Sequence, residues 1–150
     1  MMLRALVLCT VLLATSACRD STNPADRSGI AGQYELETVD GQRQLPCCAH
    51  TDSAGALVSI GNGILQIDWN TPAGAYEWYF VLNYDYQDGT SEQVQSSFSS
   101  GTYTLDGTTL TLVDSSNNLG RMTGSASDHE IVIQAPNHSY GFFRLPQLPH

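Results

Sequence analysis

Two adjacent cysteines, followed by a histidine and an aspartate, are the residues of this chain best suited to chemistry. They lie in the segment LPCCAHTD, residues 45–52. The thiols of Cys47 and Cys48 can join in a disulfide, stay free or link two chains. With His50 and Asp52 nearby, the segment also offers soft and hard donor atoms to a metal ion. The compartment of the protein and the spacing of these four residues bear on the choice.

The N-terminus has the build of a secretory signal, which indicates an oxidising compartment. Residues 1–17, MMLRALVLCTVLLATSA, combine a basic start at Arg4 with small residues at the end and an apolar run too short to span a membrane. The end of this segment resembles a bacterial lipoprotein lipobox, with Thr15 where that motif usually has leucine. The resemblance implies that Cys18 becomes the lipidated first residue of the mature chain. The alternative is a conventional signal peptidase, which accepts small residues such as Thr15 and Ala17 and would cut the same bond without adding a lipid.

The residues after Cys18 indicate where the protein is held. Arg19 rather than aspartate follows the cysteine, and the sorting rule of Gram-negative lipoproteins then implies the outer membrane. The segment RDSTNPADRS is polar and predicts a flexible tether. We therefore expect three regions, namely a signal peptide over residues 1–17, a lipid-anchored tether over 18–28 and one folded domain over 29–150.

An extracytoplasmic location favours a disulfide between Cys47 and Cys48. Cys9 leaves with the signal and Cys18 carries the lipid, so the two remaining thiols have only each other within the chain. A ring between adjacent residues is strained and easily reduced. Zinc is disfavoured because its sites space cysteines by about two to four residues. We predict a vicinal disulfide in a loop between the first two strands, and neither a metal nor a cofactor.

The charge of the chain restricts its partners. The sequence has 15 acidic residues against 6 basic ones, all of them arginine, and a net charge of −9. Binding to phosphate groups depends on lysine and arginine. We therefore expect no nucleic-acid partner, and contact with the membrane only through the N-terminal lipid.

An alternation of apolar and polar residues after Gly29 predicts an all-β domain. Short turns, among them GNG at Gly61–Gly63, join antiparallel neighbours in a meander. The predicted strands are Gly32–Val39, Ala56–Ile60, Gly63–Trp69, Ala75–Gln87, Ser91–Leu105, Thr108–Val113, Leu119–Ala126, Glu130–Gln134 and Ser139–Leu145. Eight or nine such strands, with one buried face and no covering helix, are best satisfied by closing into an up-and-down barrel. A two-sheet sandwich is the alternative.

One segment carries a family resemblance. GQYELETVDGQRQLP, Gly32–Pro46, resembles the opening of small secreted lipocalin-like (calycin-like) domains of bacteria, and GTYTLDGTTLTL, Gly101–Leu112, is similar to a later hairpin of that family. Lipocalins proper have a tryptophan at the position of Tyr34 and an arginine packed over it, for which Arg144 is the counterpart here. The resemblance implies a barrel with a pocket and no catalytic residues.

A row of aromatic residues suggests what the pocket holds. Apolar walls with a few polar ends are typical of a small-molecule site. The residues expected to line it are Trp69, Tyr76, Trp78, Phe80 and Tyr84. No nucleophile elbow, P-loop, metalloprotease or dinucleotide motif occurs in the sequence, so we expect no enzyme. The predicted function is an envelope lipoprotein that binds a small hydrophobic or amphipathic ligand. The alternative is a non-enzymatic structural or protein-interaction module with a filled core.

Overall fold

A computed structural model describes residues 29–43, 45–68, 74–116 and 119–146, which form strands and turns without a helix. The predicted signal peptide, Cys18, the tether and Trp69 lie outside these residues. The strands are β1 (Gly32–Val39), β2 (Cys47–Thr51), β3 (Leu57–Asp68), β4 (Ala75–Asp85), β5 (Ser91–Asp106), β6 (Thr109–Asp114), β7 (Arg121–Ala126), β8 (Glu130–Gln134) and β9 (Ser139–Arg144).

Eight of these strands close into an antiparallel meander barrel. The order around the sheet is β1-β9-β8-β7-β6-β5-β4-β3-β2, and β1 also pairs with β3. This last pairing joins the two ends of the sheet and leaves β2 outside the ring as an extra strand on β3. The structure thus confirms the barrel and excludes the two-sheet sandwich. The architecture is consistent with a calycin-like fold.

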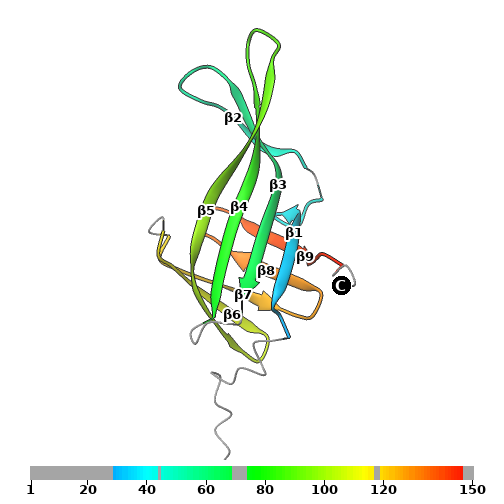
Figure 1. The fold of residues 1–150 in the computed structure, drawn as a ribbon, viewed down its shortest axis with the longest axis vertical. Helices are drawn as coiled ribbons and strands as arrows, with labels where there is room; N and C mark the ends of the chain where they lie inside the picture. Colours follow the sequence, from blue (N-terminus) through cyan, green and yellow to red (C-terminus); the bar gives the residue numbers. More distant parts are fainter. Residues whose placement is uncertain (1–28, 44, 69–73, 117–118, 147–150) are drawn as a thin grey trace, which may run out of the picture.

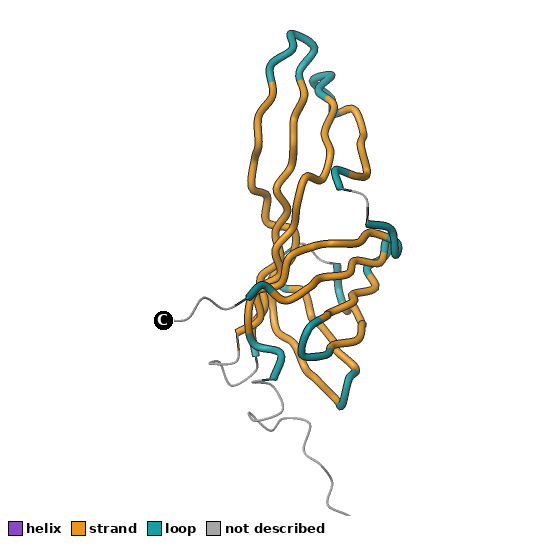
Figure 2. Tube along the Cα trace, turned by 90° about the vertical axis from the view of Figure 1, so that its right-hand side faces the viewer, coloured by secondary structure: helices purple, strands orange, loops and turns teal. Residues whose placement is uncertain are grey.

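The barrel wall is uneven in height, because three strands extend beyond it (Figure 1). β1 pairs only with residues 64–67 of β3, and β6 pairs with β5 only from Gly101 onward. Above these points β3, β4 and β5 stay paired with one another and β2 adds to β3. We call this projecting sheet the arm. It consists of β2, residues 57–62 of β3, residues 81–85 of β4 and residues 91–97 of β5, and Figure 2 shows it rising away from the barrel.

Two predictions about the first half of the chain are wrong. The segment GNG does not turn, because β3 continues through it with a bulge between Ile60 and Asn62. The Asn62 side chain stabilises this bulge by donating to Glu35 at 2.7 Å and accepting from the amide of Gly63 at 2.6 Å. The cysteine segment is not a loop either, since Cys47–Thr51 pairs with β3 as β2.

The inner face of the barrel follows the predicted alternation. Buried side chains at every second position include Tyr34, Leu36, Leu110, Leu112, Ile131 and Ile133. The Arg144 guanidinium lies 5.4 Å from the centre of the Tyr34 ring, as the family resemblance implies. It also donates to the carbonyl oxygens of Gly29 at 3.0 Å and Ala31 at 2.6 Å. The arginine thereby ties the chain entering β1 to the last strand.

Candidate functional site at the mouth of the barrel

The predicted lining residues separate into an interior group and an arm residue. Tyr76, Trp78 and Phe80 point into the barrel and are buried. Tyr84 lies further along the same face of β4, on the arm, and its ring stacks on Tyr86 at 6.4 Å. The structure therefore brings three of the five residues together and places Tyr84 apart from them.

An aromatic cluster fills the barrel around Trp78, whose side chain is 0% exposed. Four rings surround its indole at centroid distances of 5.5, 4.6, 4.9 and 5.2 Å, those of Phe80, Phe98, Tyr140 and Phe142. We call these five residues the aromatic cluster. Edge and tilted contacts at these separations are favourable beyond the area they bury. The indole Nε1 has no hydrogen-bond partner among the described residues.

Three of these cluster residues were missed at the sequence level. Phe98 stands among serines in SSFSS and owes its place to a bulge, where Trp78 pairs with Ser99 and Tyr79 pairs with Ser97. The extra residue turns Phe98 inward. Tyr140 and Phe142 occupy alternate positions in a short strand, a signal that was present in the sequence.

The polar end of Tyr76 is satisfied inside the protein. Its hydroxyl contacts Ser99 Oγ at 2.7 Å, and Ser99 Oγ donates to Asp114 Oδ1 at 2.8 Å. Burial would raise the pKa of the Asp114 carboxyl, but hydrogen bonds from Leu119, Ser99 and Ser116 outweigh it and hold the pKa well below its usual range. This chain of contacts ties β4, β5 and the turn after β6, so Tyr76 acts as a core residue.

An apolar row leaves the barrel and continues along the arm. Leu82 pairs with Ile60 of β3 on one side and with Val94 of β5 on the other, on the same face of the sheet as Phe80. Ile60 and Leu82 are half-buried against the core, whereas Val94 is 36% exposed. We call Ile60, Leu82 and Val94 the arm strip. It extends the inner surface of the barrel beyond the point where the barrel is closed.

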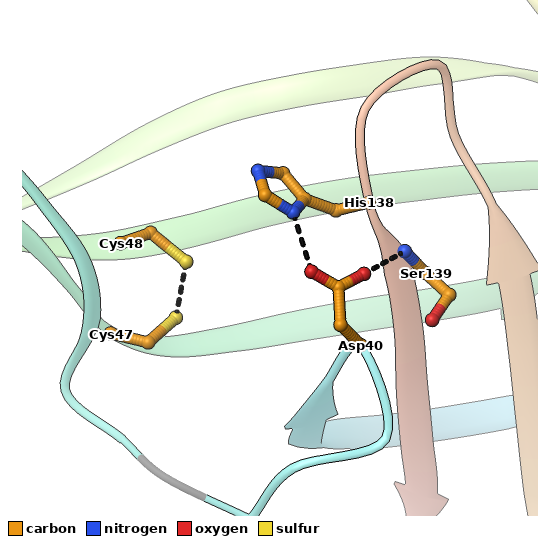
Figure 3. A network of polar contacts seen from close by, with 5 residues as sticks. All are labelled: Asp40, Cys47, Cys48, His138 and Ser139. Atoms are coloured by element: carbon orange, nitrogen blue, oxygen red, sulfur yellow. Dashed lines mark hydrogen bonds and ion pairs between the residues drawn. The ribbon is translucent and has the colours of Figure 1, made fainter.

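A pocket of about 380 Å³ lies beside the arm strip, where the ends of β1 and β2 meet. We call it the mouth pocket, and its lining residues are Val39, Asp40, Gln42, Pro46, Cys47 and Cys48. Cys47 pairs with Ile60, so the pocket adjoins the arm strip. Asp40 at its rim accepts from the amide of Ser139 and contacts His138 Nδ1, each at 2.8 Å (Figure 3). The hydrogen bond from His138 lowers the pKa of Asp40.

The two cysteines of β2 differ in their surroundings, because Cys47 packs against the core and Cys48 is exposed. Both residues are free cysteines in the structure, with their Sγ atoms 2.6 Å apart, so the vicinal disulfide stays a prediction. Burial and the neighbouring Cys48 thiol raise the pKa of Cys47 to about 12. Burial, followed by the charges of Cys48 and Cys47, raises the pKa of Tyr140 to about 12. Cys47 packs against the core, which includes Tyr140 of the aromatic cluster.

Two other acidic side chains have structural partners. Asp52 Oδ1 caps a turn by accepting from the amides of Ala54 and Ala56 at 2.9 Å. Glu37 forms an exposed ion pair with Arg43 at 2.9 Å. Across the described part of the chain, no group of three or more histidine, cysteine, aspartate or glutamate side chains is placed to hold a metal ion.

Comparisons with known proteins add no name to this geometry. No protein-family model, curated protein or solved structure matches the chain. Within the described ranges, no helix is long and apolar enough to cross a membrane.

Proposed function

We propose that this protein is an extracytoplasmic bacterial lipoprotein, anchored through Cys18, whose barrel binds a small hydrophobic or amphipathic ligand without catalysing a reaction. The ligand site is the mouth of the barrel, between the arm strip and the mouth pocket. The observation that carries this proposal is the arm strip, an apolar row that runs from a sealed core onto an open surface. Exposed apolar surface that continues a core is a common mark of a binding site.

The mouth suits a ligand better than the interior does. Trp78 and the four rings around it occupy the barrel at their level, so a ligand would have to displace well-packed aromatic contacts there. The mouth pocket, at about 380 Å³, falls within the size range of small-molecule sites. Among the five residues expected from the sequence, Phe80 and Tyr84 flank the arm strip on the same face of β4.

The two sides of the mouth differ in polarity, which favours an amphipathic ligand. The arm strip supplies Ile60, Leu82 and Val94, while the rim opposite carries Asp40 and His138. An apolar body would lie along the arm strip, and a polar end would reach the rim. This division resembles the general design of ligand sites, in which a few polar groups orient a mostly apolar molecule.

The filled interior supports a second candidate function. The aromatic cluster is what a structural or protein-interaction module with a solid core would have, and such a module would use the arm as a contact surface instead of a ligand site. The two candidates differ in whether a small apolar molecule binds the isolated protein.

A dye-binding measurement separates these candidates. We expect residues 18–150, made with Cys18→Ser so that the protein carries no lipid, to bind N-phenyl-1-naphthylamine, an uncharged naphthalene dye, at one site in buffer without detergent, with a rise in dye emission. The substitution Val94→Asp should weaken this binding by about tenfold or more, because a carboxylate beside an apolar ligand loses its hydration.

Val113→Asp is the matched control for this substitution. Val113 is 47% exposed on β6 and follows the buried Leu112, so its side chain lies on the outer face of the barrel and its replacement should leave the affinity for the dye unchanged. If Val94→Asp and Val113→Asp change the affinity for the dye equally, the dye does not bind at the mouth. If the wild-type protein binds neither the dye nor any member of a broad lipid panel, the interaction module is the better description.

A further inference from the structure

Cys47 and Cys48 present their sulfur atoms on the same side of the chain, which is unusual for neighbours in a strand. Successive side chains of a regular strand point to opposite faces. Here Cys48 has a φ of 61°, in the left-handed region, and the register of β2 shifts between Cys47 and His50. These two irregularities bring the sulfurs into contact (Figure 3).

This backbone arrangement has a cost that the surrounding structure must offset. A left-handed conformation is unfavourable for a residue other than glycine, because its Cβ atom comes too close to the following carbonyl oxygen. The pairings of Cys47 with Ile60 and of His50 with Val58 hold the segment on either side of Cys48. Residues held in such sparsely populated conformations are found preferentially at functional sites.

The two thiols differ in accessibility. Cys48 is exposed to solvent, whereas Cys47 is half-buried and packs against the core. Burial, followed by the neighbouring Cys48 thiol, raises the pKa of Cys47. Since the thiolate is the nucleophile in thiol–disulfide exchange, a reagent in solution meets a reactive partner in Cys48 and a protected one in Cys47.

We propose that Cys47 and Cys48 form a thiol–disulfide exchange site that reacts with small-molecule disulfides at the mouth of the barrel. The Cys48 sulfur attacks one sulfur of the small disulfide, whose S–S bond breaks and releases one thiol. The Cys47 sulfur then attacks the Cys48 sulfur of the mixed disulfide and releases the second thiol. The protein loses two electrons and two protons, and the small disulfide gains them as two thiols.

The site is expected to work in both directions. Adjacent α-carbons lie about 3.8 Å apart across a trans peptide, which is below the usual range of about 4.4–6.8 Å for residues joined by a disulfide. Constrained disulfides are more easily reduced than structural ones. A thiol of the same small molecule therefore returns the pair to its reduced state. The inference does not depend on ligand binding at the mouth.

Trypsin cleaves the chain so that the redox state of Cys47 and Cys48 can be measured separately from that of Cys9 and Cys18. The chain has no lysine, and trypsin cleavage after Arg43 and Arg121 gives the peptide of residues 44–121, which contains Cys47 and Cys48 as its only cysteines. The full-length protein is equilibrated with mixtures of reduced and oxidised glutathione, quenched, digested and analysed by mass spectrometry.

We expect a growing share of this peptide to be lighter by two hydrogen atoms as oxidised glutathione increases, and to regain them when reduced glutathione is restored. Cys47→Ser should accumulate one glutathione on Cys48. Cys48→Ser should react about tenfold more slowly, because its remaining thiol, Cys47, is half-buried and packs against the core. The neighbouring Ala49→Ser, also exposed, should behave as the wild type.

Three results would overturn the proposal. They are a peptide of unchanged mass across all glutathione mixtures, a peptide joined to a second copy instead of closed on itself, and equal reaction rates of the two single-cysteine variants. The wild-type titration decides the first two even if a cysteine variant folds poorly.

Discussion

Ser99 is the residue on which the polar interior of the barrel depends. Its side chain is 0% exposed, and its hydroxyl connects Tyr76 on one side with Asp114 on the other. A buried hydroxyl without a partner is costly, whereas a paired one is close to neutral. Serine is therefore required here for its hydrogen-bonding capacity, since its size alone would fit alanine equally well.

Replacing Ser99 tests this role. Ser99→Ala removes the partner of the buried Tyr76 hydroxyl, and we expect the free energy of unfolding to fall by about 1–3 kcal/mol. Urea denaturation followed by tryptophan fluorescence measures the change. Ser97→Ala, at an exposed position of the same strand, should stay within about 0.5 kcal/mol of the wild type. If both substitutions change the free energy of unfolding to a similar extent, the hydrogen bonds of Ser99 with Tyr76 and Asp114 do not contribute to stability.

At the scale of the strands, glycines determine how closely neighbours approach. Gly101 lies where β5 begins to pair with β6, opposite Asp114. A Cβ atom at this position would overlap the carbonyl oxygen of Val113, which belongs to the backbone and has no side-chain freedom to move away. Gly101 thus lies where β5 begins to pair with β6 and joins the closed barrel.

Gly101→Ala should separate β5 from β6 at this corner. Overpacking of this kind costs typically about 1–3 kcal/mol, and we expect the upper end of that range because the obstructing atom is backbone. Chemical denaturation gives the loss of stability. Thr102→Ala, at the adjacent exposed position, serves as the control and should change stability by about 0.5 kcal/mol or less. If Gly101→Ala leaves the denaturation midpoint unchanged, β6 can move away from the added methyl group without loss of stability, which would contradict this prediction.

At the scale of the whole molecule, closure of the barrel and extension of the arm come from the same strands. The lower half of β3 pairs with β1 and completes the ring, while its upper half pairs with β2 and belongs to the arm. One set of long strands therefore builds both the sealed core and the open mouth. The mouth is therefore built on strands that continue without a break from the barrel.

The proposed anchor also concerns the whole molecule, because it decides where the barrel works. We expect the full-length chain, expressed in a Gram-negative bacterium with labelled fatty acid, to carry the label and to sediment with membranes. Cys18→Ser should abolish both, because serine has no thiol to which the lipid can be attached. Cys9→Ser is the control, because Cys9 lies in the predicted signal and leaves with it. Label retained in Cys18→Ser would contradict the proposed lipidation.

The sequence alone determined the all-β class, the meander and the inner face of the strands, because a two-residue period is a local property that each strand carries by itself. It also located Tyr76, Trp78 and Phe80 in the interior, whereas the contact of Arg144 with Tyr34 was expected only from the family resemblance. Only the tertiary structure decided that GNG is a bulge, that β2 forms and that Phe98 joins the aromatic cluster. These features depend on the register between strands distant in sequence, and one extra residue reverses the face to which a side chain points. The arm strip and the contact of Cys47 with Cys48 also depend on cross-strand pairing, which the local sequence pattern does not predict.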